Sequence, residues 1–420
     1  MKVICFGPGP AFKGGISNYN TSLAKALSAF DGVSVDIVSW TQQYPGIVPR
    51  DFKDRVSQMN FLEGTQIRTH YITNYNNPLS WKATARLMAD LQPQIVIFQW
   101  SIAIQGLPLG NIIRQLKKLC PCEIILDLHF VIQKEQSAID RIFTKMGISR
   151  ADTYIVHALK TFEELKTLYP DRKFHLSYNG LRSAGKETTV IKLFHPIYDL
   201  YKPDPNFDIN EFKAKFGLRK KVILFFGFIR KYKGLHQVIE AFSQVAARRD
   251  DVSLLICGES FWNTLDPGNL MTRIKKTIFG VAKKILLRAS DDESNYKPLD
   301  LIDEFNLRDR VVVFNQFIPN EDVHKYFQVS DCVVLYYLTA TPSGIESLSY
   351  NFDLPILATR VGHFPETIQE GVNGYLADET IESMSATMEK MLDQPVNRQG
   401  VAKMKASMSW HAYAEAILNR

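Results

Sequence analysis

The sequence lacks any long hydrophobic run. Its longest strongly apolar stretch, Val222 to Ile229, is far shorter than the roughly 20 residues that a membrane-spanning helix requires. The first residues, Met1–Phe6, lead directly into a glycine-rich turn, without the longer apolar segment and small-residue cleavage site of a secretory signal. These absences predict a cytoplasmic protein.

Cysteine is also scarce, since there are five and they are scattered along the chain. Cys120-Pro121-Cys122 has neither a zinc spacing nor a second pair to complete a site. We therefore predict a reducing compartment and no metal or other cofactor. The net charge of +6 is compatible with attraction to phosphates or to an anionic membrane surface. No basic segment is interleaved with aromatic residues as a base-stacking platform would be, so no nucleic-acid partner is predicted.

What the chain does contain is alternating strands and helices. At 420 residues it is too long for one ordinary core. Ten short β-branched runs read as strands, in two series that are separated by a proline-containing linker at Phe194–Asn206: Lys2–Phe6, Val33–Val38, Gln94–Phe98, Glu123–His129 and Thr153–Val156, then Val222–Phe226, Val252–Cys257, Val311–Phe314, Cys332–Tyr336 and Pro355–Ala358. Strands that alternate with helical patterns indicate parallel, doubly wound sheets. The sequence predicts an α/β protein of two Rossmann-like domains, 1–195 and 206–400, with a last helix at 401–420 that could pack back on the first domain.

The first candidate site is the glycine-rich loop between the first strand and the first helix. Glycine at a helix start lets backbone amides approach a phosphate, with help from the helix dipole. The Gly14-Gly15 pair lies directly at that start, so we favour a phosphate-binding role over a plain turn for it. Gly7 and Gly9 fit either role equally. The dinucleotide fingerprint fails, because Asp36 lies inside the second strand and not at its carboxyl end.

A second candidate follows the buried strand Val222–Phe226. The strand ends at Gly227, and Arg230, Lys231 and Lys233 come before the next helix. The carboxyl edge of an α/β sheet is where ligands bind, and cations there can stabilise a departing diphosphate. Arg230 and Lys233 are predicted to do so, whereas Lys231 alone reads as an ordinary surface residue.

A third candidate lies after the strand Cys332–Tyr336, where Ser343 can cap a new helix. The amides of Ser343, Gly344 and Ile345 would then point into a cleft. Glu346 in the first turn is either an acceptor for a sugar or ribose hydroxyl or a surface acid that complements the helix dipole. The local pattern does not separate the two.

One segment, 271–288, combines six basic residues with apolar residues at helical spacing and has no acidic residue. It could form a helix that lies on an anionic membrane, which would give a peripheral location at the inner face. A solvated helix that packs its apolar face on the domain is the favoured alternative.

In their order and spacing these motifs resemble the retaining GT-B fold enzymes of glycosyltransferase family four. The matching pieces are Gly14-Gly15-Ile16, Phe226–Gly234, Leu255–Glu259, and Ser343-Gly344 with the stretch from Leu354 to Gly374. The resemblance implies two domains that face a central cleft. In that cleft Gly14, Gly15, Gly227 and the amides at 343–345 would contact the donor, and Arg230 and Lys233 would grip its diphosphate. His129, which ends the run Ile124–His129, resembles the family's histidine facing the donor sugar.

The chain departs from the family pattern at its acidic pair. The two expected glutamates fall at Ala340 and Leu348, the expected glycine falls at Asp353, and Glu346 is two residues out of register. Arg230 is likewise two positions later than in the commonest pattern. Contacts to the donor sugar are therefore less well predicted than contacts to its phosphates.

The resemblance implies transfer of a hexose-type sugar from a nucleoside diphosphate to a hydroxyl group, with retained configuration and without a metal. A saccharide or lipid-linked saccharide acceptor, in cell-surface polysaccharide or lipid-linked oligosaccharide synthesis, is a family-level expectation. Acceptor recognition is expected around Trp40–Phe61 and Gln99–Leu107. The alternatives are a nucleotide-sugar epimerase of the same fold and a non-catalytic relative that binds a nucleotide sugar.

Overall fold

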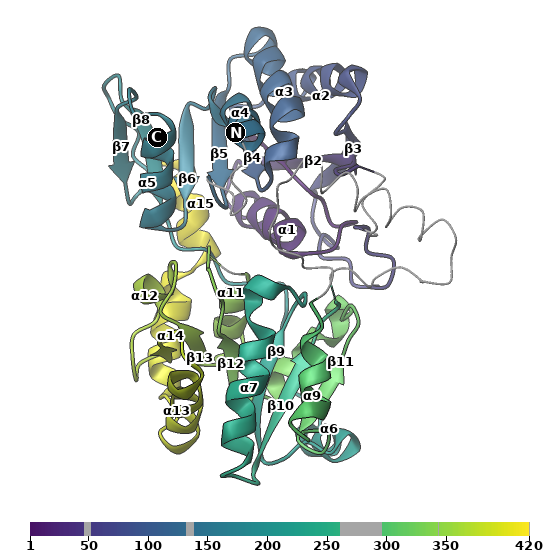
Figure 1. The fold of residues 1–420 in the computed structure, drawn as a ribbon. Coiled ribbons are helices and arrows are strands. Elements are labelled where there is room, and N and C mark those ends of the chain that lie inside the picture. The colour runs from purple at the N-terminus through teal and green to yellow at the C-terminus, as the bar shows by residue number, and fades with distance from the viewer. Residues whose placement is uncertain (46–51, 132–137, 261–295, 343, 420) are drawn as a thin grey trace.

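The computed structural model describes residues 1–45, 52–131, 138–260, 296–342 and 344–419. Two of the expectations above concern the basic segment 271–288 and Ser343, which lie outside the described residues. The described chain forms two α/β units, one above the other in Figure 1. Each unit is a sheet together with its helices, and we call the two units the first and the second layer. The chain crosses between them once at the linker and returns with its last helices.

The first layer is built on an eight-stranded parallel sheet with the strand order β3-β2-β1-β4-β5-β6-β8-β7. Successive residues of β1 bury their side chains in different clusters, because Val3 and Cys5 face one core and Ile4 and Phe6 face the other. A strand that is buried on both faces in this way is typical of a doubly wound sheet. The strands are β1 (Lys2–Phe6), β2 (Ser34–Gln42), β3 (Arg68–Asn74), β4 (Ile95–Trp100), β5 (Glu123–Leu128), β6 (Thr153–Val156), β7 (Phe174–Ser177) and β8 (Thr188–Lys192).

The second layer is a six-stranded parallel sheet with the order β11-β10-β9-β12-β13-β14. Its strands are short and buried, and β9 lies near the centre between β10 and β12. The strands are β9 (Lys221–Phe226), β10 (Val252–Cys257), β11 (Val311–Phe314), β12 (Cys332–Leu335), β13 (Ile356–Thr359) and β14 (Gly374–Ala377). The expected α/β class with two doubly wound sheets is confirmed.

Helices cover the sheets. Those of the first layer are α1 (Gly15–Ser28), α2 (Pro78–Asp90), η1 (Ala103–Gln105), α3 (Gly106–Leu119), α4 (Ala138–Ile148) and α5 (Leu159–Leu168). Those of the second are α6 (Ile209–Phe216), η2 (Lys231–Lys233), α7 (Leu235–Ala246), η4 (Pro298–Asp300), α9 (Leu301–Glu304), η5 (Asn320–Asp322), α10 (Val323–Gln328), α11 (Gly344–Asn351), α12 (Phe364–Thr367), α13 (Ile381–Asp393) and α14 (Arg398–Ser407).

All ten predicted strands are present, with ends that differ by a few residues. Four strands of the described chain were not predicted: β3, β7, β8 and β14. Edge strand β3 is mostly half-buried and mixes polar with apolar residues, so it lacks a hydrophobic period. Strand β14 begins at Gly374, a residue that is depleted in strands.

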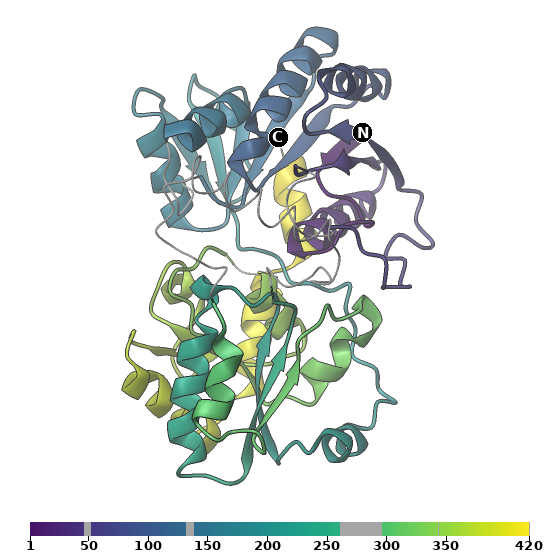
Figure 2. The ribbon, with the colours of Figure 1, turned by 45° about the vertical axis from the view of Figure 1, so that its right-hand side comes forward.

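The last helix, α15 (Trp410–Leu418), returns to the first layer and packs on α1, as Figure 2 shows. The indole nitrogen of Trp410 donates to the carbonyl of Ile197 at 2.6 Å. Arg182 donates to the carbonyls of Ile417, at 2.8 Å, and of Asn419, at 3.1 Å, near the carboxyl end of the helix. A cation at this end also complements the helix dipole. Since α14 packs on α11 of the second layer, the last two helices join the two layers.

Gly180 makes this docking possible. Its φ is +85°, and a Cβ atom there would lie 1.7 Å from the carbonyl oxygen of Ala416 in α15. We predict that Gly180→Ala lowers the free energy of unfolding by about 2 to 4 kcal/mol, from backbone strain and overpacking together. Urea unfolding followed by circular dichroism measures this effect.

Gly64→Ala is the matched control, because Gly64 has a φ of +74° and nothing lies within 4 Å of its added Cβ. Its cost should be only the strain of a left-handed residue, about 1 kcal/mol. Equal losses in the two variants would show that the contact with α15 contributes nothing.

Candidate functional site

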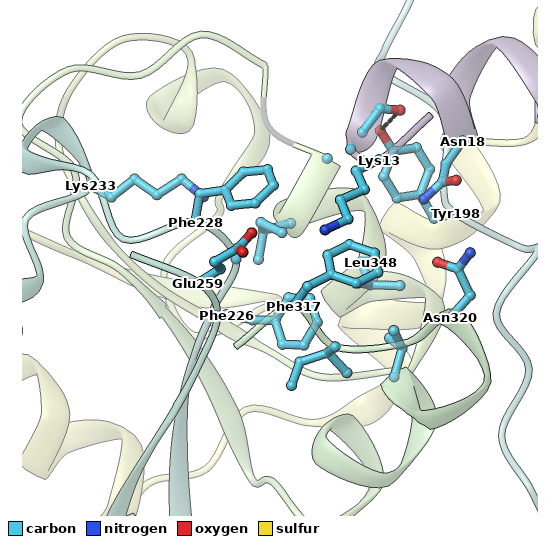
Figure 3. Close-up of a pocket in the computed structure, with 18 of the residues that line it drawn as sticks. Lys13, Asn18, Tyr198, Phe226, Phe228, Lys233, Glu259, Phe317, Asn320 and Leu348 are labelled. Atoms are coloured by element: carbon cyan, nitrogen blue, oxygen red, sulfur yellow. Dashed lines mark hydrogen bonds between the residues drawn. The ribbon is translucent and has the colours of Figure 1, made fainter. Parts of the chain in front are cut away.

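A cavity of about 270 Å³ lies between the two layers (Figure 3). Its second-layer wall comes from segments that directly follow four neighbouring strands: Gly227 after β9, Gly258 after β10, Phe317 after β11 and Tyr337 after β12. Its first-layer wall comes from the loop before α1, from α1 itself and from Asp54. This is the carboxyl edge of the second sheet, the position at which doubly wound folds bind ligands.

The start of α1 contributes Gly14 and Gly15 to the wall. Gly14, at φ +107°, caps the helix, and no side chain bonds to the first-turn amides. The amide of Ser17 donates to the carbonyl of Gly14 at 3.2 Å, and the positive end of the helix dipole at this start favours an anion. Gly7 and Gly9 differ, because their amides donate to Val38 O (3.1 Å) and to Ser39 Oγ (2.7 Å), so these glycines shape the turn.

Tyr198 of the linker joins the two glycine-led helix starts. Its hydroxyl donates to the carbonyl of Gly15 at 2.9 Å, the dashed contact in Figure 3. A Cβ atom on Gly344, where α11 begins, would lie 2.6 Å from the same hydroxyl oxygen. Burial raises the pKa of Tyr198, so the hydroxyl keeps its proton. The starts of α1 and α11 therefore lie on either side of one neutral tyrosine.

Lys233 is the buried cation of the second layer. It ends η2, is 8% exposed, and lines the cavity with Gly227 and Ile345. A Cβ atom on Gly227, at φ +97°, would lie 2.9 Å from Lys233 Nζ and 3.2 Å from Ile345 Cδ1. Only glycine therefore leaves room for the lysine to pass the strand end. Lys13 is the cation of the opposite wall, with its Nζ 4.6 Å from the ring centroid of Phe317.

Arg230 and Glu346 do not line this cavity. The Arg230 guanidinium is 5.3 Å from the ring centroid of Tyr232. The Glu346 carboxylate is 2% exposed and accepts hydrogen bonds of 2.5 Å from Thr367 Oγ1 and from His363 Nε2. These bonds tie the first turn of α11 to α12. A donor-binding role for Glu346 and a catalytic role for Arg230 stay predictions.

His129 also lies outside the cavity wall, at the carboxyl end of β5. Its Nε2 is 2.8 Å from the side-chain oxygen of Gln99, and its ring is 4.9 Å from that of Tyr19. Burial lowers the pKa of His129 to about 4, while the charge of Asp127 opposes the shift and that of His157 adds to it. The imidazole is therefore neutral at pH 7.

Beneath His129 lies a buried polar cluster from four distant parts of the chain. Tyr19 and Tyr413 donate to Asp127 Oδ2 at 2.8 and 3.3 Å, and His157 Nε2 is 3.0 Å from the Tyr413 hydroxyl. His157 Nε2 is also 3.2 Å from Asp127 Oδ1, a close contact without hydrogen-bond alignment. Burial raises the pKa of Asp127, but the attraction of His157 and the Tyr19 hydrogen bond outweigh it and lower the pKa to about 2.

The two layers touch along one side of the cavity. Asn18 Nδ2 donates to the Tyr201 hydroxyl at 2.5 Å, and that hydroxyl donates to Asn320 Oδ1 at 2.7 Å. The amide of Asn320 in turn donates to Ser57 Oγ at 3.0 Å. Three of the four residues, all except Ser57, line the cavity, so these bonds connect the two layers at the cavity wall.

Sequence reasoning missed several wall residues. Lys13 directly precedes Gly14-Gly15, and its charge was a signal that could have been used. Tyr198, Phe317 and Asn320 carry no local signal, because an aromatic or amide residue in a loop fits many roles. Two carboxylates, Asp54 and Glu259, also line the cavity and offer acceptors for hydroxyl groups.

The described residues contain no group of three or more histidine, cysteine, aspartate or glutamate side chains placed to hold a metal ion. Within the same ranges, no helix combines the length and the hydropathy that crossing a bilayer requires.

Residues 206–413, the part that holds Gly227, Lys233 and Gly344, match the family described as glycosyl transferases group 1. This is a group 1 glycosyltransferase domain. Spore coat protein SA from Bacillus subtilis is 24% identical over 218 residues, which cover 50% of this chain and 51% of that protein. D-inositol 3-phosphate glycosyltransferase from Segniliparus rotundus is 25% identical over 220 residues, 49% of this chain and 41% of that protein. The match thus spans about half or less of each relative's length.

The fold comparison covers the whole chain. The structure of Anabaena Alr3699/HepE in complex with UDP and glucose superposes with a TM-score of 0.61, over 100% of this chain and 96% of that one, at 14% identity. At this identity the likeness shows the fold, which is the GT-B arrangement of two Rossmann-like layers. The group 1 glycosyltransferase domain therefore forms the second layer of a GT-B fold.

The lowered pKa of His129 predicts a pH dependence of stability. Between pH 6.5 and 4 the unfolded chain binds a proton that the folded chain does not, so folding loses stability as the pH falls through this window. In His129→Gln the slope of the unfolding free energy against pH in this window should be smaller, by the amount that corresponds to about one bound proton. Guanidinium unfolding at intervals of about half a pH unit measures this slope. The exposed His411→Gln is the matched control, and an unchanged slope in His129→Gln would contradict the prediction.

Proposed function

We propose that this chain transfers a hexose-type sugar from a nucleoside diphosphate sugar to a hydroxyl group, with retention of the anomeric configuration. The observation that supports it is the convergence of two helix starts and two lysines on one interlayer cavity in a group 1 glycosyltransferase domain. Both kinds of group stabilise anions, and the cavity also has the carboxylates of Asp54 and Glu259 for hydroxyl groups. A diphosphate joined to a sugar combines these two chemistries.

In this proposal the diphosphate lies between the start of α1 and the start of α11, within reach of Lys233. As the bond from the sugar to the diphosphate breaks, negative charge grows on the leaving phosphate oxygen. Fixed amides and a buried ammonium stabilise that charge without reorganising, which is the largest contribution of many active sites. Arg230 would act from the same loop. These cations make a metal ion unnecessary for the transfer that we propose.

The acceptor hydroxyl would approach the same face of the sugar that the diphosphate leaves, and a phosphate oxygen would take its proton. This scheme uses no carboxylate nucleophile, and it is consistent with the position of Glu346, whose two oxygens are held by Thr367 and His363. The relatives support a sugar-nucleotide donor, since the Anabaena protein was solved with UDP and glucose. We propose a saccharide or lipid-linked saccharide as the acceptor. Membrane contact by the segment 271–288 remains a prediction.

A panel of nucleotide sugars tests the function directly. We expect one UDP- or GDP-linked hexose to release its nucleoside diphosphate in the presence of a saccharide acceptor, with the sugar recovered in the product as the retained anomer by NMR. A new isomer of the nucleotide sugar would instead show epimerisation. Thermal stabilisation by a nucleotide sugar without turnover would show binding alone.

Lys233→Ala tests the role of the cavity cation. Because the loss of one preorganised electrostatic contact costs about 100- to 1,000-fold, we expect kcat/KM to fall by that factor while the unfolding curve stays close to wild type. Lys231→Ala, two residues earlier in η2 and not at the cavity wall, is the control and should keep most of the activity. Near-normal turnover in Lys233→Ala would remove the lysine from the mechanism.

A further inference from the structure

Gln99 and His129 form a hydrogen-bonded pair at the edge of the first sheet that faces the second layer. They come from neighbouring strands, since β4 and β5 pair with Gln99 opposite Asp127, and His129 follows β5 directly. The backbone amide of His129 donates to the carbonyl of Trp100 at 3.2 Å, and this bond holds the backbone of His129 in place. His129 Nε2 and the Gln99 oxygen are then 2.8 Å apart.

Gln99 is held rigidly. It is 2% exposed, and a Cβ atom on Gly7 would lie 2.8 Å from its Cγ, so the glycine-rich loop packs directly on this side chain. An amide oxygen can only accept a hydrogen bond. In the structure the Gln99 oxygen faces the ring and the Gln99 nitrogen has no hydrogen-bond partner among the described residues, and in this orientation the contact needs the proton on Nε2 of His129. Because burial keeps the pKa of His129 near 4, the ring has this single proton at pH 7 and its other nitrogen has a lone pair.

That other nitrogen, Nδ1, is the one a ligand can reach. It makes no hydrogen bond within the described chain, yet it is not among the polar atoms that are cut off from solvent, unlike Nδ1 of His157 and of His363. The nearby charge of Asp127 is already stabilised by the hydroxyls of Tyr19 and Tyr413.

We propose that Gln99 is a positioning residue that holds His129 in the Nε2-protonated tautomer, so that Nδ1 accepts a hydrogen bond from a sugar hydroxyl group in the cleft. The identity of the ligand rests on the proposed function, whereas the tautomer does not. Nδ1 of His129 would then bind only a hydroxyl group that donates a hydrogen bond, and His129 itself would neither donate a proton from Nδ1 nor carry a charge.

The tautomer is measured without any substrate. In protein with ¹⁵N-labelled histidine, two-bond ¹H–¹⁵N correlation at pH 7 separates a protonated ring nitrogen from one with a lone pair, and the His129→Gln variant assigns the signals. We expect a protonated Nε2 and an unprotonated Nδ1 for His129. A protonated Nδ1, or an imidazolium, in the wild-type protein would overturn the proposal.

Gln99→Leu tests whether the glutamine causes this state. We expect a mixture of tautomers at His129 and at least about a tenfold loss of kcat/KM, as for one lost hydrogen bond. Gln328→Leu is the matched control, because Gln328 accepts from another histidine, His324 Nδ1, at 2.7 Å in the second layer and should leave the His129 signals unchanged. A wild-type tautomer in Gln99→Leu would overturn the role of Gln99. If no nucleotide sugar is turned over at all, the proposed function fails while the spectra still decide this inference.

Discussion

The cleft depends on the close approach of two helix starts to the ring of Tyr198. The hydroxyl of this linker tyrosine is bonded to Gly15, and the space next to it leaves no room for a side chain at Gly344. The absence of side chains at both positions brings backbone amides to the cavity wall. The same packing that joins the layers at the linker thus places two helix starts, with the positive ends of their dipoles, at the site.

A similar constraint operates on the second-layer side. Gly227 is glycine because the ammonium of Lys233 passes within contact distance of where a Cβ atom would be. That lysine lies in a wall built from strand ends and is 8% exposed. The hydrogen bonds from Asn18 through Tyr201 to Asn320 hold the opposite wall at a fixed distance. Both walls of the cavity therefore depend on close packing between the layers.

The cluster around Asp127 shows how distant segments support a single side chain. Tyr413 comes from the last helix, and its hydroxyl meets Tyr19 of α1 at 2.6 Å beside a carboxylate that is fully buried. Without these donors, the buried charge would be strongly destabilising and would draw a proton toward itself. The return of α15 to the first layer therefore helps to stabilise the charge of the Asp127 carboxylate, which lies close to His129.

The sequence by itself determined the fold class, and it singled out several residues that the structure places in the cavity wall. The buried strands could be recognised because they are short apolar runs. Gly14, Gly15, Gly227 and Lys233 could be singled out because they stand at strand or helix ends, where the local pattern already implies their position. The tertiary structure alone decided the rest. Tyr198, Phe317 and Asn320 enter the wall only because the linker and the second sheet meet the first, and Glu346 points to His363 because α12 packs against its helix. Local sequence specifies local geometry, but which side chains meet across a domain interface depends on long-range packing that no short segment contains.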